Sequence, residues 1–596
     1  TRASHKPHQI PTTCNCNSKY HLFDRDMASN NSSNTETSAP GRQKADFKAT
    51  VWGDFFITHV FSDQETVDGW TEGIEALKEE VKAMMMISTE KLHLIDVVER
   101  LGIGYHFETE IGEQLQQLYC DGASRRQNDT FSDGDGDNLL TTALQFRLLR
   151  QHGYNVPCEI FNQFKNQEGS FKEELGKDIN GLMSLYEAAF LQTHGETIME
   201  EAVEFAGDHL RNYYFKVDRG DEDDDNRVLS KRIAHVLERP LRKGAPRHEH
   251  LFFITVYEQE KGHNKTLLKL AKLSWNHLQS IYQQEIRGIS KWWIDLDFAT
   301  RIYFARDRLV EIYFWAIGSM WEPKYALSRY FLTKITILIS VTDDMYEERG
   351  KLDELALFTS TVERWDTTNM KDLPGYMRTL FAAINDVVDE IATTTIAQGR
   401  HYCGDYLKEA EKYIMRAYLS HARWFAAGEV PTVEEYKRVG IHSSAYPPLA
   451  CAALCGLGEK APKEAFEWLL SDPKIFVAVS DHCRLMDDIL AHQFEQKSGH
   501  GPSMVECYMK QYEVPRGEAV KALKTMVKDD WKEINKECLI DQPSFVSKEI
   551  ISMLVGLARM MEVLYTEFDG YGTSDRVTKD IVRAVLVTPM VIVDDV

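Results

Sequence analysis

Two acidic segments contain the side chains of this sequence that are best suited to bind metal ions. The first, ISVTDDMYEERGKL, places Asp343 and Glu347 four residues apart at the end of an apolar run. On a helix this spacing puts the two carboxylates on one face, about 40° apart, so that they can share a ligand. Mg²⁺ is typically held by one or two carboxylates together with phosphate oxygens. The segment therefore predicts part of a magnesium site, with Asp344 pointing away from this face and supporting the ligands from behind.

The second acidic segment, DHCRLMDDILAHQFEQK, predicts a helical stripe that is polar rather than part of the core. Within about 80° on one side of a helix, the stripe collects Arg484, Asp487, Ala491 and Glu495. The apolar surface of this helix is expected from Ile475, Phe476, Val479, Met486, Ile489, Leu490 and Phe494. An arginine and two acids along three turns would repel or pair among themselves unless a ligand bridges them. A metal diphosphate is such a ligand.

Either segment alone also has a structural explanation, because acids are common where helix ends meet water. Together, on two separate predicted helices, they favour a site with two opposed walls. The segment ARDR adds cations with Arg306 and Arg308, shortly before the first acids. Arginine is suited to bidentate recognition of phosphate. The alternative for ARDR is a solvated helix end that pairs with Asp307.

The composition limits the kinds of ligand that the protein can attract. The chain has 596 residues and a net charge of −23, from 69 basic and 92 acidic residues. Such a surface repels nucleic acids and anionic membranes, so a phosphate ligand needs local cations or metal ions. Ten scattered cysteines favour a reducing compartment. The longest apolar run is too short to span a membrane, so stable membrane insertion is not expected.

The pattern of apolar residues predicts an all-α protein with two domains. Segments such as TEGIEALKEEVKAMM and TALQFRLLRQHGY repeat apolar residues at three- and four-residue spacing, and no comparable run alternates as strands do. The length also favours two domains. We expect a disordered leader and N-terminal segment over residues 1–45, an N-terminal domain over 46–265 and a C-terminal domain over 266–596. Residues 1–26 lack the apolar core of a signal peptide, and Met27 is a natural start.

The two acidic segments and ARDR together resemble the metal and arginine motifs of plant class I terpene synthases, in particular the sesquiterpene synthases. This resemblance extends over residues 42–585. It implies the two-domain αβ-type terpene synthase architecture, with a class I isoprenoid synthase helical bundle in the C-terminal domain. The N-terminal domain would then be a helical, barrel-like domain without an active site of its own. Arg42 is followed by Gln43 rather than a second arginine, which favours a cytosolic enzyme over a plastid one.

The resemblance implies Mg²⁺-dependent ionisation of farnesyl diphosphate, an allylic diphosphate, and cyclisation of the carbocation to a sesquiterpene hydrocarbon or alcohol, with release of diphosphate. Three Mg²⁺ ions are implied, with Mn²⁺ as a substitute. The implied metal ligands are Asp343, Glu347, Asp487 and Glu495, and the implied diphosphate-binding residues are Arg306, Arg308, Arg484 and Lys497. The implied catalytic residues are Asp343, Arg306, Trp315, Tyr565, Asp569 and Tyr571.

The sequence departs from the family pattern at two predicted metal ligands. Glu347 stands where the family more often has Asp, which lengthens one ligand by a methylene group. Ala491 stands where Ser or Thr is usual, so that water replaces this ligand or the ligand is absent, and metal affinity could suffer. In IHSSAYPPLACAAL, Pro447 and Pro448 must break a helix, and in the family this break lines the pocket.

Other functions stay open at this point. An isoprenyl diphosphate synthase also uses two acidic motifs and Mg²⁺, and a monoterpene synthase would use geranyl diphosphate instead of farnesyl diphosphate. A helical scaffold or an inactive relative is the non-enzymatic alternative, and Ala491 gives it some support. A monomer is expected. The sequence does not identify the terpene product, nor whether water or proton loss ends the reaction.

Overall fold

The computed structural model describes residues 49–127, 138–217, 224–498, 501–574 and 577–592. The chain divides into two compact units, residues 1–40 and 41–596, and every described residue belongs to the second. The predictions for residues 1–45 and for Arg42 and Gln43 therefore lie outside the described residues. In the described ranges the regular elements are all helices, with one isolated bridge between Lys165 and Phe171. The predicted all-α fold is confirmed.

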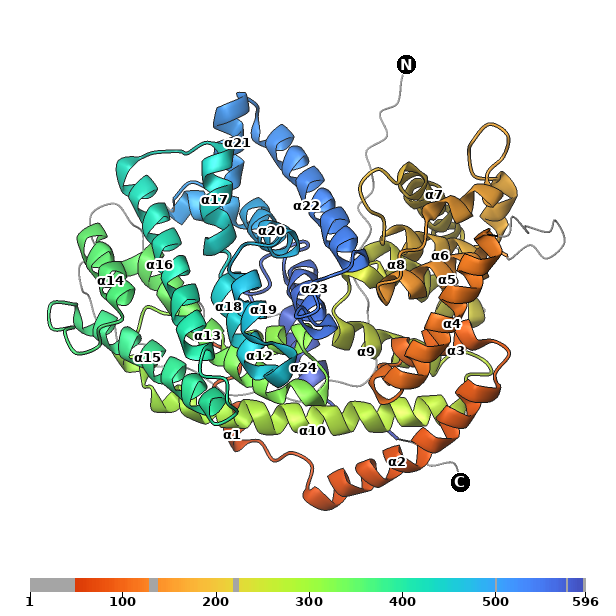
Figure 1. The fold of residues 1–596 in the computed structure, drawn as a ribbon, viewed down its shortest axis with the longest axis horizontal. Helices are drawn as coiled ribbons and strands as arrows, with labels where there is room; N and C mark the ends of the chain where they lie inside the picture. Colours follow the sequence, from red (N-terminus) through yellow and green to blue (C-terminus); the bar gives the residue numbers. More distant parts are fainter. Residues whose placement is uncertain (1–48, 128–137, 218–223, 499–500, 575–576, 593–596) are drawn as a thin grey trace. The chain divides into compact units, whose positions relative to one another are not determined.

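Most of the helices before residue 260 lie together in Figure 1 and pack on helices that are near them in the sequence. They are α1 (Phe55–Thr58), α2 (Gln64–Ile87), α3 (Lys91–Arg100), α4 (Glu108–Gln127), α5 (Leu139–Gln151), α6 (Ile179–Ala189), α7 (Thr197–Val217), α8 (Asp224–Glu238) and α9 (Pro246–Tyr257). Side-chain caps stabilise the N-termini of several helices. The Asp63 side chain accepts a hydrogen bond from the backbone N–H of Thr66 at the start of α2, and the Asn138 side chain accepts one from the backbone N–H of Thr141 at the start of α5. Because α5 contacts α6, α6 contacts α7 and α7 contacts α8, neighbouring helices bury one another's apolar faces.

The later helices form the group that carries both acidic segments. They are α10 (Lys265–Asp295), α11 (Phe298–Arg301), α12 (Leu309–Ser319), α13 (Ala326–Asp344), α14 (Leu352–Arg364), α15 (Gly375–Ile396), α16 (Cys403–Ala427), α17 (Val433–Ser443), α18 (Tyr446–Gly456), α19 (Lys463–Leu469), α20 (Lys474–Ser498), α21 (Met504–Tyr512), α22 (Arg516–Leu539), α23 (Lys548–Leu564) and α24 (Val577–Leu586). The first acids end α13, which packs on α12, α15 and α18. The second acids lie within α20, which packs on α17, α22 and α23.

Short helical segments connect these elements. The 3₁₀ segments are η1 (Gly104–His106), η2 (Cys158–Phe164), η3 (Glu173–Lys177), η4 (Leu241–Lys243), η5 (Pro323–Tyr325) and η7 (Gly458–Lys460). One segment, η6 (Met345–Arg349), is a π-helix that continues directly from α13. The expectation that Asp343 and Glu347 share a regular α-helix is therefore wrong in detail. A π turn holds more residues than an α turn, and such turns are frequent at functional sites.

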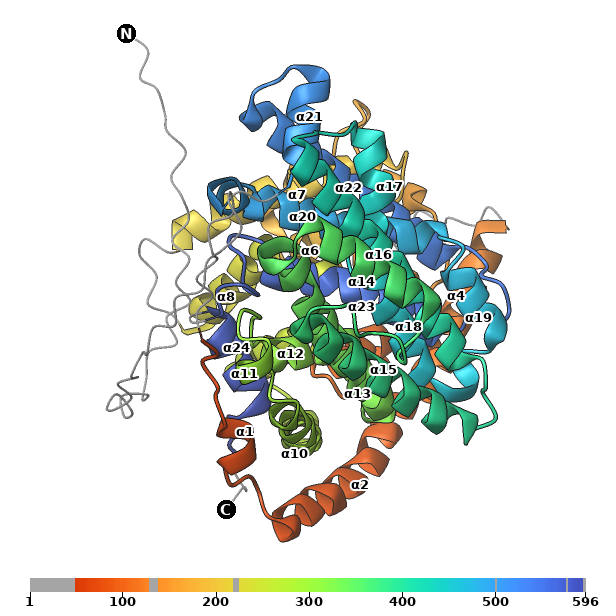
Figure 2. The ribbon, with the colours of Figure 1, turned by 90° about the vertical axis from the view of Figure 1, so that its left-hand side faces the viewer.

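The long helix α10 contacts helices from both parts of the chain. It packs against α1, α2 and α9, and also against α12, α13 and α24. Figure 2 shows α10 nearly end-on, between α2 and the green helices α12 and α13. α10 begins at Lys265, where the sequence predicts a domain boundary. The helix nevertheless contacts helices on both sides of that predicted boundary. The boundary between residues 265 and 266 stays a prediction.

The core beneath the first acids is apolar. In α13 the side chains of Phe331, Ile335, Leu338 and Val341 are buried, and they lead up to the first acids. None of the helices in the described ranges is long and apolar enough to cross a membrane. The apolar run before Asp343 is therefore explained by burial in the bundle.

Candidate active site

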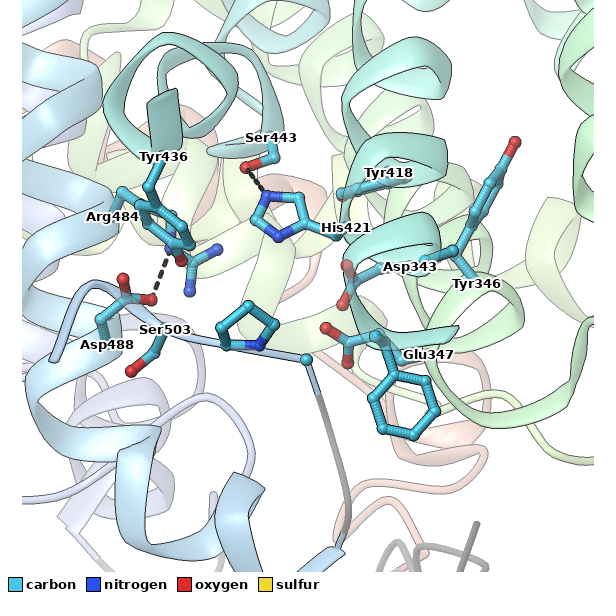
Figure 3. Close-up of a pocket in the computed structure, with 14 residues that line it drawn as sticks. Asp343, Tyr346, Glu347, Tyr418, His421, Tyr436, Ser443, Arg484, Asp488 and Ser503 are labelled. Atoms are coloured by element: carbon cyan, nitrogen blue, oxygen red, sulfur yellow. Dashed lines mark hydrogen bonds and ion pairs between the residues drawn. The ribbon is translucent and has the colours of Figure 1, made fainter. Parts of the chain in front are cut away.

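One pocket collects side chains from both acidic segments (Figure 3). Its lining residues come from the end of α13 and η6, from α16, α17 and α20, and from the segment before α21; they are Asp343, Tyr346, Glu347, Tyr418, His421, Ala422, Phe425, Tyr436, Ser443, Arg484, Asp488, Gly501, Pro502 and Ser503. Figure 3 shows Asp343 and Glu347 on one wall, with Arg484 and Asp488 on the opposite wall. The two distant segments of the sequence thus face a common hollow.

The first wall is organised by Arg306. Its Nη2 lies 3.0 Å from Asp343 Oδ2, and its Nε lies 2.7 Å from Asp344 Oδ1. The backbone N–H of Arg306 also donates to Asp344 Oδ2 at 2.7 Å. Asp344 is fully buried, whereas 27% of the Asp343 side chain is exposed. Burial raises the pKa of Asp344 to about 7, although Arg306 opposes this shift. Asp344 therefore anchors the wall and Asp343 faces the pocket.

The second wall also pairs one arginine with two neighbouring aspartates. Arg484 Nε donates to Asp488 Oδ1 at 2.8 Å, and Arg484 Nη2 pairs with Asp487. Asp488 Oδ2 accepts the backbone N–H of Met504 at 2.8 Å. Asp488 is 1% exposed and burial raises its pKa, whereas 26% of the Asp487 side chain is exposed. Asp487 is not among the residues that line the pocket, but its ion-pair partner Arg484 is.

Two predicted residues of the second segment cannot be placed. Glu495 and Lys497 belong to the last turns of α20, but their side chains lie outside the described residues. Ala491 lies one turn after Asp487 on the same helix and offers no oxygen for a metal. The metal role of Asp487 and Glu495 and the diphosphate role of Lys497 stay predictions.

The C-terminal segment that contains Tyr565 and Tyr571 contacts the first wall through an aromatic ring. The Tyr571 hydroxyl hydrogen bonds with Ser340, and its ring centroid lies 5.6 Å from the Arg306 guanidinium. The Trp315 ring lies 6.3 Å from the rings of both Tyr565 and Tyr571. The predicted tryptophan thus lies beside both tyrosines, and Tyr571 also lies beside Arg306.

Asp569 shapes the turn that carries Tyr571. Its Oδ1 accepts the backbone N–H groups of Tyr571 at 3.0 Å and of Gly572 at 2.8 Å. Burial raises the pKa of Asp569, and the negative charge of Asp487 acts in the same direction. The same charge also acts on Tyr565, so the C-terminal segment and the second wall are within electrostatic reach of each other.

Arg308 occupies a different environment from Arg306. It is 1% exposed, and its guanidinium donates to the backbone carbonyls of Tyr571 at 3.1 Å and of Gly572 at 3.0 Å. A third donor contacts the carbonyl of Asp307 at 3.0 Å. These contacts tie the ARDR segment to the C-terminal segment. The predicted contact of Arg308 with diphosphate stays a prediction.

The break after α17 follows from two prolines. Helix α17 ends at Ser443, and α18 begins at Tyr446 with Pro447 and Pro448 in its first turn. Ala445 between them has a φ of 69°, in the left-handed region that residues other than glycine rarely adopt. Ser443 lines the pocket. The predicted helix break is confirmed, and it lies at the pocket.

His421 lines the pocket but was not identified in the sequence. One ring nitrogen, Nε2, lies 3.0 Å from the Ser443 hydroxyl oxygen. Burial lowers the pKa of His421 to about 3, and the positive charge of Arg484 contributes to this shift. The neighbouring Tyr418 has a pKa raised by burial and by the charges of Asp343 and Glu347. A single histidine on an amphipathic helix gives no motif, so only the structure reveals its place.

The donor set fits Mg²⁺ bound together with a phosphate ligand. In the described part of the chain no three His, Cys, Asp or Glu side chains converge into a metal cluster. The first wall instead offers two carboxylates, Asp343 and Glu347, to the same pocket. Mg²⁺ prefers oxygen ligands and is commonly held by one or two carboxylates, with water and substrate phosphates completing its coordination. The side chains that are present satisfy this requirement.

Comparisons with known proteins agree over most of the chain. Residues 51–237 match the model described as "Terpene synthase, N-terminal domain", and residues 294–533 match "Terpene synthase family, metal binding domain". (-)-Germacrene D synthase of Vitis vinifera is 42% identical over 554 residues, which cover 92% of this chain and 96% of that protein. Valencene synthase of Vitis vinifera is also 42% identical, over 92% of this chain and 97% of that protein.

Solved structures show the same similarity. A crystal structure of limonene synthase with 2-fluorolinalyl diphosphate has a TM-score of 0.85 and 32% identity, and covers 92% of this chain and 100% of that chain. Isoprene synthase from grey poplar leaves, in complex with three Mg²⁺ ions and dimethylallyl-S-thiolodiphosphate, has a TM-score of 0.80 and 33% identity, and covers 89% of this chain and 99% of that chain. The chain described here belongs to the terpene synthase family.

Proposed function

We propose that the protein is a sesquiterpene synthase that ionises farnesyl diphosphate with Mg²⁺ and cyclises the resulting carbocation to a sesquiterpene hydrocarbon or alcohol. The observation that carries this proposal is the pocket between Asp343 and Glu347 on one wall and Arg484 on the other. The names of two relatives, (-)-germacrene D synthase and valencene synthase, support the sesquiterpene class.

The reaction begins when the bond between the allylic carbon and the diphosphate oxygen breaks. Negative charge then develops on the departing diphosphate, and Mg²⁺, when bound, neutralises it. Asp343 and Glu347 would hold metal ions on the first wall, and Asp487 and Glu495 on the second. Arg484 and Arg306 would place fixed positive charges at the same end of the site. Such preorganised charges stabilise a transition state because they need no reorganisation as the bond breaks.

The carbocation needs an apolar, electron-rich environment. The rings of Trp315, Tyr565 and Tyr571 form such a group beside Arg306. An aromatic face attracts a cation by about 0.5–2 kcal/mol. We assign these rings to the hydrocarbon end of the substrate, and Asp569 to positioning Tyr571 through its two backbone hydrogen bonds.

Arg308 is best assigned to positioning the C-terminal segment. Its three carbonyl acceptors occupy a guanidinium that is 1% exposed. Breaking these contacts would remove three hydrogen bonds from a buried cation, which costs free energy. Arg308 would therefore favour the closed arrangement in which Tyr571 covers Arg306 and water is kept from the carbocation.

The test is a product assay with the purified protein, Mg²⁺ and geranyl, farnesyl or geranylgeranyl diphosphate in turn. Gas chromatography with mass spectrometry should find cyclic sesquiterpenes from farnesyl diphosphate, together with stoichiometric release of diphosphate. Products from geranyl diphosphate alone would show a monoterpene synthase. A lengthened diphosphate without hydrocarbon or alcohol would show an isoprenyl diphosphate synthase. Diphosphate release no faster than that of Asp343→Ala would show an inactive scaffold.

Further properties belong to this proposal. We infer that three Mg²⁺ ions act, that Mn²⁺ can replace them, and that the enzyme is a cytosolic monomer that binds no nucleic acid. The three Mg²⁺ ions of the isoprene synthase complex support the metal count. Activity titrated with each metal, light scattering of the purified chain, and cell fractionation test these properties in turn.

A further inference from the structure

A second cavity lies among the helices before residue 260 and is separate from the candidate active site. Its volume is about 330 Å³, within the range of roughly 300–1,000 Å³ that is usual for small-molecule sites. The walls are formed by α3, α5, α6, α8 and α9, and α23 contributes Arg559. None of its lining residues lines the pocket of the candidate active site.

One part of the lining is apolar. The apolar side chains come from α5, α6, α8, η4 and α9; they are Leu140, Leu144, Met183, Val236, Leu241, Pro246, Phe252 and Phe253. Such a surface favours a ligand with an apolar body, because removing apolar area from water is favourable. Leu140 is 38% exposed, whereas Met183 and Val236 are buried, so the apolar surface continues from the outside inward.

Most charged groups of the lining already have partners of opposite charge. Arg100 Nε lies 2.8 Å from Asp96 Oδ1, and Arg100 also pairs with Glu187. Arg147 pairs with Asp96. His235 Nε2 lies 2.7 Å from Glu249 Oε2. Arg232 and Glu99 pair with residues outside the lining, Glu260 and His152. These groups are compensated without a ligand.

Arg559 is the exception. Its Nε donates to the backbone carbonyl of Arg242 at 2.9 Å. Within the described ranges, no carboxylate forms an ion pair with its guanidinium. The negative charge of Glu249 acts on Arg559, but the Glu249 carboxylate already pairs with His235. Burial lowers the pKa of Arg559 to about 9, and the positive charge of Arg242 adds to this effect. Arg559 is half-buried, and a cation with limited access to water and no ion pair is stabilised by an anion in the cavity.

We propose that this cavity is a second ligand site, which binds a small amphipathic anion through Arg559 and the apolar side chains of α6 and α8. The ligand class is a carboxylate or a phosphate monoester joined to an apolar body. Its anionic group would accept hydrogen bonds from the Arg559 guanidinium, and its body would lie against Met183 and Val236. Because the anion is held by a guanidinium, binding needs no metal ion, in contrast to the diphosphate in the candidate active site.

Isothermal titration calorimetry of the full chain in EDTA tests the proposal, with octanoate and octyl phosphate as separate probes. At least one probe should bind with a stoichiometry of one. Arg559→Met should weaken that binding by about tenfold or more, whereas Arg559→Lys, which keeps the charge, should weaken it less. The stronger probe identifies the carboxylate or the phosphate class. Asp343→Asn should leave binding unchanged, which separates this site from the proposed catalytic function.

A second variant keeps the test decisive if Arg559→Met does not fold. Met183→Trp fills the apolar part of the cavity and leaves Arg559 in place, so it should also weaken binding by about tenfold. The melting temperature and the circular dichroism spectrum of each variant report on folding. The proposal is overturned if neither probe binds the wild type at about 1 mM, or if the folded variants bind as tightly as the wild type.

Discussion

The two walls of the candidate active site differ in the backbone that carries their acids. Asp343 and Asp344 end α13, where the chain enters the π-helix η6, whereas Asp487 and Asp488 lie inside the uninterrupted helix α20. Their arginines also differ in origin. Arg306 reaches the first wall from a separate segment, whereas Arg484 lies on the same helix as its partners, at spacings of three and four residues.

This difference shows that one arrangement can be built by tertiary contacts or within a single helix. In both walls the second aspartate is buried against arginine and the first is about one quarter exposed. The first wall presents Asp343 and Glu347 to the pocket together, across the junction of α13 and η6. The second wall keeps helical spacing, so its next ligand position falls on Ala491. We therefore expect the first wall to bind metal more strongly.

The largest expected effect is that of Asp343→Asn. Removing the exposed carboxylate of the first wall should lower turnover of farnesyl diphosphate about a thousandfold, equivalent to about 4 kcal/mol. Asp487→Asn should cost about tenfold less, because the second wall has fewer ligands. Steady-state release of diphosphate measures both. Asp353→Asn, an exposed acid on α14, is the matched control and should retain full activity. Equal losses at Asp343 and Asp487 would contradict the inequality of the walls.

The two arginines should differ in their effect on stability. Arg306→Met leaves Asp344 buried without its ion pair, which should lower the free energy of unfolding by about 3–5 kcal/mol. Arg484→Met leaves Asp488 with two donors, the Met504 amide and the Tyr436 hydroxyl, whereas Asp344 keeps one, the backbone N–H of residue 306, so the loss should be about 1–3 kcal/mol. Urea unfolding followed by circular dichroism measures both. A larger loss of unfolding free energy for Arg484→Met would show that an arginine from a separate segment does not stabilise its wall more than an arginine on the same helix.

A buried acid on α16 affects any comparison of the walls at different pH. Glu411 is 1% exposed, its Oε2 has no hydrogen-bond partner among the described residues, and burial raises its pKa to about 8 from 4.5. The folded protein therefore keeps a proton that the unfolded chain releases above pH 4.5. The contribution of this carboxyl to stability is greatest below pH 4.5 and is lost as the pH rises to about 8.

Glu411→Gln should remove this pH dependence. Relative to the wild type, the variant should gain stability between pH 5 and pH 8, by roughly 2–4 kcal/mol. Urea unfolding at several pH values checks the prediction, with Glu409→Gln on the same helix as the control. An unchanged pH profile would show that Glu411 is ionised in the folded protein. The wall variants are best compared in the Glu411→Gln background.

The smallest expected effect is that of adding a ligand to the second wall. Ala491→Thr supplies a hydroxyl at the position where the second acidic segment lacks one. The Mg²⁺ concentration at half-maximal activity should fall about three- to fivefold, which corresponds to about 1 kcal/mol. Ala491→Val has nearly the same shape without the oxygen and should not show this gain. If both variants need the same Mg²⁺ concentration for half-maximal activity, the missing hydroxyl ligand does not limit metal binding at the second wall.

Regular helical spacing predicted the helices and their acidic faces, whereas the meeting of the two acidic segments was predicted from the two motifs together and the family resemblance. Apolar periodicity is set by burial, so α13 and α20 were predictable as helices with acidic ends or stripes. The π turn at Met345–Arg349 was not, because no residue type marks one inserted residue. His421 and the acceptors of Arg308 also escaped prediction. Their roles depend on contacts between distant helices, which local spacing does not encode.

The contacts of Arg308 have a consequence for the order in which the protein can mature. Arg308 leaves the ribosome long before Tyr571 and Gly572, whose carbonyls it binds in the folded protein. Until those residues are synthesised, the two hydrogen bonds to their carbonyls cannot form, so the donors that make them stay hydrated. The contact between the ARDR segment and the C-terminal segment is therefore completed only when nearly the whole polypeptide has been translated. A chain that ends before residue 571 would keep its acidic segments but lack the Tyr571 ring beside Arg306.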